Sequence, residues 1–325
     1  MGTSRRSLLG VLAATVGITS PAPADDYPSK SIRLVVGFPP GGPTDIVGRL
    51  IGQGLGRELG QSVVIDNRGG AGGTIGAALV AKSKPDGYTL LVSVESAQTR
   101  GLALYPSLPY DQVKDFSFIR KVAKQHNLLV VHPSLPVSNV KELIEYLRKR
   151  PGEVNCGGTL GASSSIGCTL FDRDNDTKMT FINYPGGAQP VTDLISGTLQ
   201  VGLFAEATVS QQVASGKLKA IAIAASERSR AFPNLPTIEQ SGAKPMELSP
   251  WFGVVGPAGM PPAVVKKIGD ALDRVSASPE FMTQLEGIGA VPIKGSTSDS
   301  FARDVAAEIP FWNLWAAEVK ASLPK

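Results

Sequence analysis

The stretch from Ile32 to Val47 constrains the fold more than any other part of this chain. Its beginning, Ile32 to Val36, is nearly continuously apolar, which is typical of a parallel strand buried on both faces. A loop rich in glycine and proline follows. Pro43 then suits the first position of a helix, with Gly42 as its N-cap. Such a unit places free backbone N–H groups at the end of a parallel strand, and this favours binding of an anion.

The same loop approaches the glycine spacing of a nucleotide P-loop over residues 37–44. Pro43 stands where that motif has the lysine that neutralises the β- and γ-phosphates, so the match is weak. A second glycine cluster, from Gly70 to Gly76, is one residue out of register with a dinucleotide fingerprint, and the acidic residue that should follow is absent. We interpret this cluster as a flexible surface turn with close helix packing. A carboxylate ligand carries less charge than a nucleotide phosphate, so the loop at residues 37–44 could bind a carboxylate without the P-loop lysine.

The length of 325 residues exceeds what one hydrophobic core usually organises, so we expect two domains. The composition, 42% hydrophobic and 18% charged, is that of a soluble α/β protein. A formal net charge of +4 is too mild to suggest nucleic acid as a partner, which would require a clustered basic face.

Residues 1–24 have the features of a secretory signal. Arg5 and Arg6 precede an apolar run, and Ala22-Pro23-Ala24 offers a small-x-small cleavage site. The paired arginines resemble a twin-arginine signal, while Sec export remains the alternative. No other segment reaches about 18 uninterrupted apolar residues. We therefore expect an exported, periplasmic, soluble mature protein.

After the leader, strands and helices alternate, which is typical of doubly wound α/β domains. Strands are expected at residues 32–36, 63–65, 88–94, 119–123, 128–131, 154–156, 179–182, 199–204, 219–225 and 251–255. Helices are expected at 43–59, after Thr74, after Asn139, around 170, around 191–195, before Gly216, at 262–276 and at 298–320. The stretch 104–118 is expected to be irregular.

Cys156 and Cys168 are the only cysteines, and His126 and His132 are the only histidines. We expect two buried free thiols, with a disulfide as the less favoured alternative, because sequence cannot supply the Cα separation. Neither histidine forms a ligand spacing with a cysteine, so no metal site is predicted.

Two further loops follow strand ends. The loop from Gly157 to Ser165 is rich in glycine and hydroxyl groups and opens a helix. Its serines do not form a nucleophile elbow, so we interpret them as N-cap and ligand hydroxyls. The loop from Asn183 to Ala188 is a third junction of this kind. Ser93 and Ser96 lie at the carboxyl end of another strand, at the edge where α/β sheets bind ligands.

Several motifs together resemble the Bug-type receptors of tripartite tricarboxylate transporters. They are the stretches 32–46, 67–76, 85–91, 108–111, 184–188, 216–220 and 251–253, and they span the mature chain. The resemblance implies a two-lobed periplasmic binding protein, type II-like, with a doubly wound, mostly parallel sheet in each lobe. It implies no catalysis and no cofactor, capture of a small carboxylate through backbone N–H groups and bridging waters, and possible membrane transporter subunits as partners.

Carried over by residue, the resemblance implies two loops that grip the ligand like a pincer and two that set specificity. The implied ligand-binding residues are Phe38, Gly41, Gly42, Thr44 and Asp45 in the first loop, Tyr184, Gly186 and Ala188 in the second, and Ser93, Ser96, Thr159, Gly161, Ala162, Ser163 and Ser164 for specificity. Glu206 could hold a ligand amine or be solvated. Pro185 replaces the usual lysine, and the loop from Gly157 is shorter by about one residue than the common family form.

We expect residues 25–122 and 224–325 to form lobe 1, residues 123–223 to form lobe 2, and closure by hinge bending near Val122 and Ala224. A monomeric receptor is the first hypothesis. The alternatives are an exported nucleotide- or dinucleotide-dependent enzyme and a scaffold or adhesin without a ligand-dependent shape change.

Overall fold

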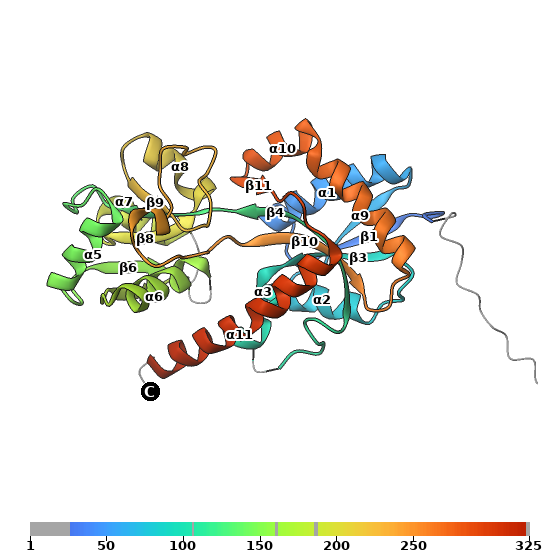
Figure 1. Cartoon of the computed structure of the whole chain (residues 1–325), viewed down its shortest axis with the longest axis horizontal. Coiled ribbons are helices and arrows are strands. Elements are labelled where there is room, and N and C mark those ends of the chain that lie inside the picture. Colours follow the sequence, from blue (N-terminus) through green and yellow to red (C-terminus); the bar gives the residue numbers. More distant parts are fainter. Residues whose placement is uncertain (1–26, 106, 160–161, 185–187, 323–325) are drawn as a thin grey trace, which may run out of the picture.

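The computed structural model describes residues 27–105, 107–159, 162–184 and 188–322, and it contains two mixed sheets that form two lobes (Figure 1). The first lobe has the strand order β11-β4-β10-β3-β1-β2 and the second β7-β6-β8-β5-β9. The first sheet comprises β1 (Ile32–Val36), β2 (Val63–Asn67), β3 (Thr89–Val94), β4 (Phe116–Gln125), β10 (Trp251–Pro257) and β11 (Ala290–Pro292). The second comprises β5 (Asn127–Val131), β6 (Asn155–Gly158), β7 (Thr180–Asn183), β8 (Val201–Ala205) and β9 (Lys219–Ile223).

Helices cover both sheets (Figure 1). The first lobe carries α1 (Pro43–Leu59), α2 (Thr74–Ala81), α3 (Glu95–Gln98), α4 (Gly101–Leu104), α9 (Pro262–Ala277), α10 (Pro279–Glu286) and α11 (Ser298–Ser322). The second carries α5 (Val140–Lys149), α6 (Ser163–Asn175), α7 (Ala188–Ser196) and α8 (Glu206–Ala214), and short 3-10 turns are η2 (Ala71–Gly73) and η3 (Glu239–Ser241). The two-lobed α/β prediction is therefore confirmed.

Each sheet has a parallel part at one edge and an antiparallel part at the other. β1 pairs in parallel with β2 and β3, and β6 pairs in parallel with β7 and β8. β10, β4 and β11 are antiparallel, as are β5 and its neighbours β8 and β9. The sheets are thus less parallel than expected, because the strands near the crossing between lobes run antiparallel.

Local signals placed several helix ends correctly. Gly42 is the extended N-cap of α1, and Gly60 ends the helix with a left-handed φ of 67°. Asn139 caps α5 by accepting from the Glu142 N–H at 2.9 Å. The helices α3, α4 and α10 and the strand β11 were not expected. They are short, and short elements carry little periodicity.

Two connections join the lobes. His126 links β4 to β5, and the chain returns through residues 248–250, where the Gln125 N–H donates to the Pro250 carbonyl at 2.9 Å. Ala224 lies beside this return, since it accepts from the Leu248 N–H at 2.9 Å. Ile238 and Leu248 belong to a buried cluster of the second lobe. We therefore propose that residues 224–248 belong to lobe 2 and that the return crossing lies later than Ala224.

The expectation of free thiols is wrong, because Cys156 of β6 and Cys168 of α6 form a disulfide with a Cα separation of 6.2 Å. Both cysteines are buried, and helix α6 packs against β6 and β8. This return of the helix across the strand brings the cysteines together. The separation is a tertiary distance, and nothing in the twelve-residue spacing encodes it.

The leader lies outside the described residues, so the signal peptide and its export route stay predictions. Within the described part of the chain, no helix is long and apolar enough to cross a membrane. Trp312 and Trp315 on α11 are buried in packing contacts, as expected.

Candidate functional site

The loop between β1 and α1 is held in shape by Asp45. The side chain of Asp45 is 3% exposed and accepts three hydrogen bonds. They come from the Gly41 N–H (2.9 Å), from Arg49 Nε (2.8 Å) and from the Asn67 side-chain amide (2.9 Å). The Asn67 amide also donates to the Phe38 carbonyl at 3.0 Å. Asp45 therefore positions the loop, and the N–H of Gly41 is already occupied.

The electrostatics of Asp45 favour its charged form. Burial alone would raise the pKa of this carboxyl, but the hydrogen bonds from Arg49, Gly41 and Asn67, together with the charge of Arg49, lower it from 3.8 to about 2. Asp45 is thus a fixed anion inside the loop. Because the oxygens of this side chain already have partners, we propose that the Asp45 carboxylate positions the loop and leaves the Asp45 backbone N–H to the ligand.

The close packing expected for the glycine cluster after β2 is confirmed, and this cluster forms a wall of the site. Gly73 has a φ of +95°, and a Cβ on it would lie 3.1 Å from the Phe38 ring. A Cβ on Gly37 would lie 2.8 Å from the Gly73 Cα. Ser96 donates to the Gly72 carbonyl at 2.7 Å. The loops that follow β1, β2 and β3 therefore pack against one another, and only glycine permits this close approach.

The start of α1 retains free hydrogen-bond donors. The first backbone bond of this helix runs from the Ile46 N–H to the Gly42 carbonyl at 3.0 Å. Thr44 and Asp45 lie in the first turn, and their N–H groups have no acceptor among the described residues. Two aligned donors at a helix N-terminus attract an anion through hydrogen bonds and the helix dipole.

The second lobe offers a similar arrangement after β6. Ala162 is the N-cap of α6 and no side chain caps this helix, so the interpretation of the serines as N-caps is wrong. The N–H groups of Ser163 and Ser164 have no acceptor in the described part of the chain. Thr159 Oγ1 is buried and also lacks a partner there. Its own N–H donates to Ser164 Oγ at 3.2 Å.

Tyr184 follows β7, and its hydroxyl has a hydrogen-bond partner within its own lobe. It is 8% exposed, and its hydroxyl donates to Asp193 Oδ2 at 2.7 Å. Burial and the Asp193 carboxylate raise the pKa of Tyr184 to about 12. Helix α7 begins at Ala188. Gly161 and Gly186, both predicted ligand residues, lie outside the described residues.

Two predicted side chains are less accessible than expected. Ser93 is fully buried, and its hydroxyl donates to Gln98 Oε1 at 2.9 Å. Glu206 is 6% exposed, so the alternative that it is simply solvated is wrong. Burial raises the pKa of Glu206, and a hydrogen bond from Ser229 opposes this shift. One oxygen of Glu206, Oε2, is buried without a partner in the described chain.

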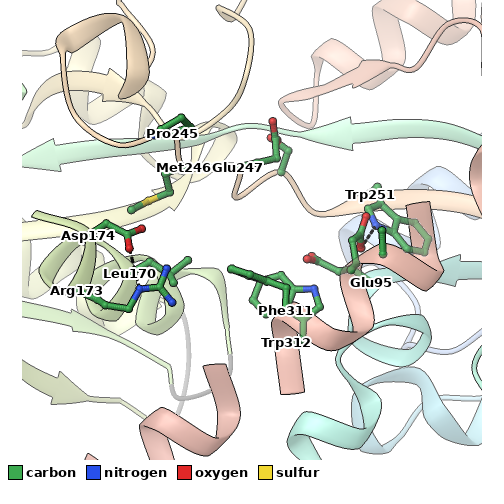
Figure 2. A pocket seen from close by; sticks show the side chains of 13 residues that line it. Glu95, Leu170, Arg173, Asp174, Pro245, Met246, Glu247, Trp251, Phe311 and Trp312 are labelled. Atoms are coloured by element: carbon green, nitrogen blue, oxygen red, sulfur yellow. Dashed lines mark hydrogen bonds and ion pairs between the residues drawn. The ribbon is translucent and has the colours of Figure 1, made fainter. Parts of the chain in front are cut away.

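A cavity of about 360 Å³ lies between the lobes, bordered by α6, by residues 245–251 and by α11 (Figure 2). Four carboxylates line it, from Glu95, Asp174, Glu247 and Glu308, but only one cation, Arg173. Glu95 is paired with Arg100 at 2.8 Å, and burial raises the pKa of its carboxyl. Three of these carboxylates have a cation partner, namely Glu95 with Arg100, Asp174 with Arg173 and Glu308 with Lys121. None of the predicted ligand-binding residues lines this cavity. The anion-binding features lie instead at the helix N-termini.

The described residues therefore offer hydrogen-bond donors and hydroxyls at the ends of parallel strands in both lobes. No group of three or more His, Cys, Asp or Glu side chains in the described chain could hold a metal ion. Sequence reasoning did not assign Asn67 to the site, although its place near a strand end and its capacity to donate and accept were visible. Such an arrangement can bind an anion.

Comparisons with known proteins agree with this geometry. Residues 47–309 match the family described as tripartite tricarboxylate transporter family receptor. Protein BugT of Bordetella pertussis is 35% identical over 319 residues, which cover 98% of both chains.

Three solved structures are also similar. R. palustris Rpa4515 with adipate has a TM-score of 0.73 and 33% identity, covering 90% of this chain and 98% of that one. MatC from Rhodopseudomonas palustris with bound malate has a TM-score of 0.70 and 30% identity, covering 89% and 100%. The periplasmic binding protein BugD has a TM-score of 0.70 and 31% identity, covering 90% and 98%.

Proposed function

Because the chain belongs to the tripartite tricarboxylate transporter family of receptors, and is thus a solute-binding receptor and not an enzyme, we propose that it captures a small organic dicarboxylate between its lobes. The observation that carries this proposal is the first turn of α1, where the N–H groups of Thr44 and Asp45 lack acceptors while the Asp45 side chain fixes the loop. Fixed donors bind an anion without the cost of ordering a mobile loop.

The second lobe supplies the other half of the proposed site. Free donors lie at the start of α6, namely the Ser163 and Ser164 N–H groups together with Thr159 Oγ1. Helix α7 begins at Ala188, and the strands that precede α6 and α7, β6 and β7, are neighbours in the sheet. We propose that one carboxylate binds at α1 and that the second lobe binds the other end of the ligand. Ser96, Gly42 and Phe38 shape the first-lobe wall, and Gly161, Ala162 and Gly186 belong to the second-lobe loops.

Similar proteins suggest the ligand class. Structures 33% and 30% identical to this chain contain adipate and malate, both dicarboxylates. We propose dicarboxylates of about this size as the first candidates, with bridging waters filling the space around them. Proteins of this family are periplasmic binding proteins, and BugD is one example. Export through the 1–24 leader, monomeric binding and delivery to membrane transporter subunits complete the proposal.

Calorimetry with the mature protein tests this function. The panel contains malate, adipate, a tricarboxylate, a monocarboxylate, ATP and NAD. We expect one dicarboxylate to bind with a stoichiometry of one and to remain chemically unchanged. Binding of ATP or NAD without any carboxylate would favour the exported enzyme instead.

A charge placed at α7 tests the second-lobe half. Ala188 is the first residue of α7, so Ala188→Asp puts a carboxylate where a helix tolerates it well. At about 4 Å from a bound carboxylate the repulsion is about 4 kcal/mol at an effective dielectric near 20, or about a thousandfold in Kd. Glu145→Asp on the exposed face of α5 is a charge-conserving control and should change nothing. Unchanged affinity in Ala188→Asp would place the ligand elsewhere.

A further inference from the structure

A second cavity lies where the lobes meet, away from the loops of the proposed ligand site. It has a volume of about 390 Å³. Its first-lobe wall comes from Lys124 on β4 and from residues 291–294 at β11, and its second-lobe wall from residues 227–230 after β9. In the first sheet, β11 and β4 lie at the edge opposite to β1 and β2. In the second sheet, β5 and β9 lie at the edge opposite to β6 and β7. We call this space the hinge-edge cavity.

The hinge-edge cavity has an excess of positive charge. Lys124, Arg228, Arg230 and Lys294 line it, against a single carboxylate, Glu227. Glu227 is already paired with Lys124 at 2.7 Å. Arg228 donates only to neutral oxygens, those of Gln240 and Pro233. The charges of Arg228 and Lys294 therefore have no carboxylate partner within the described residues.

The remaining cation, Arg230, is paired only weakly. Its closest carboxylate oxygen, on Glu286, is 3.9 Å away, and both side chains are more than half exposed. A pair of this length in water contributes little. Arg230 is thus free to turn toward an anion in the hinge-edge cavity.

A buried polar group at the same place adds an independent signal. His126 lines the hinge-edge cavity, is 2% exposed, and its Nε2 has no partner in the described chain. Burial lowers the pKa of His126, and Lys124 lowers it further, against the opposing charges of Glu227 and Glu247. A buried imidazole nitrogen without a hydrogen bond is costly, and a bound anion whose oxygen reached Nε2–H would remove that cost.

We propose that the hinge-edge cavity binds a small multivalent oxyanion, either inorganic phosphate or a tricarboxylate such as citrate. In this proposal Arg228 and Arg230 on one lobe and Lys294 on the other are the cation partners of the anion, while Lys124 stays paired with Glu227. Since the two walls belong to different lobes, a bound anion links the lobes across the crossing. By thermodynamic linkage, its occupancy and closure on the main ligand then affect each other. This inference does not depend on the ligand proposed for the main site.

The two histidines provide a direct test. His126 and His132 flank β5, so they lie about 20 Å apart at a rise of about 3.3 Å per residue. His132 is bonded to Ser134, at the far end of that strand. We would record the imidazole NMR signals of the full mature protein at constant ionic strength while adding phosphate or, separately, citrate. The expected result is a saturable shift of the His126 signals with at least one of the two anions and none for His132.

Charge variants identify the site. Lys294 is exposed and has no carboxylate partner in the described chain, so Lys294→Ala should fold normally and raise the anion Kd about three- to tenfold. Lys84→Ala, another exposed lysine after α2, removes the same charge elsewhere and should leave the Kd unchanged. Saturation by phosphate alone, by citrate alone or by both identifies the anion. Absence of any His126 shift, or equal weakening by both variants, would overturn the proposal.

Discussion

Replacing Asp45 with asparagine tests whether charge holds the loop at the start of α1. The Asp45 carboxylate is 3% exposed and bonded to Gly41, Arg49 and Asn67. Its pKa of about 2 lies almost two units below the ordinary 3.8, although burial opposes the change. A difference of two units corresponds to about 2.7 kcal/mol. Arg49 is 54% exposed, so solvent screening reduces this value, and we expect Asp45→Asn to cost about 1–2 kcal/mol at pH 7.

The pH dependence gives the sharper test. The folded-state pKa lies below that of the unfolded chain, so the stabilisation by Asp45 is fully present above about pH 4 and is lost as the pH falls toward 2. Urea unfolding followed by circular dichroism at pH 7, 4 and 3 should therefore show a gap between wild type and Asp45→Asn that narrows with acid. Glu145→Gln on the exposed face of α5 serves as control. A gap of the same size at pH 7 and pH 3, or none at pH 7, would refute the charge argument.

Two further predictions concern covalent and steric features. The double variant Cys156→Ser, Cys168→Ser removes a disulfide between residues twelve positions apart, and we expect it to lose about 3 kcal/mol of unfolding free energy. An unchanged melting temperature, or alkylation of the unreduced wild-type protein, would contradict the disulfide. Gly73→Ala places a Cβ 3.1 Å from Phe38 at a φ of +95°, whereas Gly242→Ala has a φ of +83° but no atom within 4 Å. The first should be less stable than the second by about 1–2 kcal/mol in urea unfolding, and equal losses would show that the glycine cluster is not tightly packed.

Features encoded by neighbouring residues could be predicted from the sequence. Gly42, Pro43 and Gly60 define the ends of α1 through their own backbone preferences, and Asn139 caps α5 with a partner three residues away. The features that were not predicted correctly depend on contacts between residues far apart in the sequence. Asn67 at the end of β2 bonds to Asp45 of α1, 22 positions away in the sequence, and the cysteines meet because α6 folds back over its sheet.

The structure also shows which groups the side chains of several predicted ligand residues bind. Family motifs indicated Asp45, Ser93 and Tyr184, yet each side chain has its partner inside its own lobe. A motif shows which residues matter at a site, whereas burial and hydrogen bonding separate a group that positions a loop from one that contacts a ligand.

A crystal structure of the mature protein with the tightest-binding dicarboxylate of the calorimetric panel would locate the bound ligand. We expect one ligand carboxylate within about 2.7–3.2 Å of the Thr44 and Asp45 N–H groups, and the other end of the ligand against the loops that open α6 and α7. A dicarboxylate bound in the acidic cavity beside Glu95 and Trp312, or in the hinge-edge cavity with the start of α1 left unbound, would refute the proposed two-lobe ligand site.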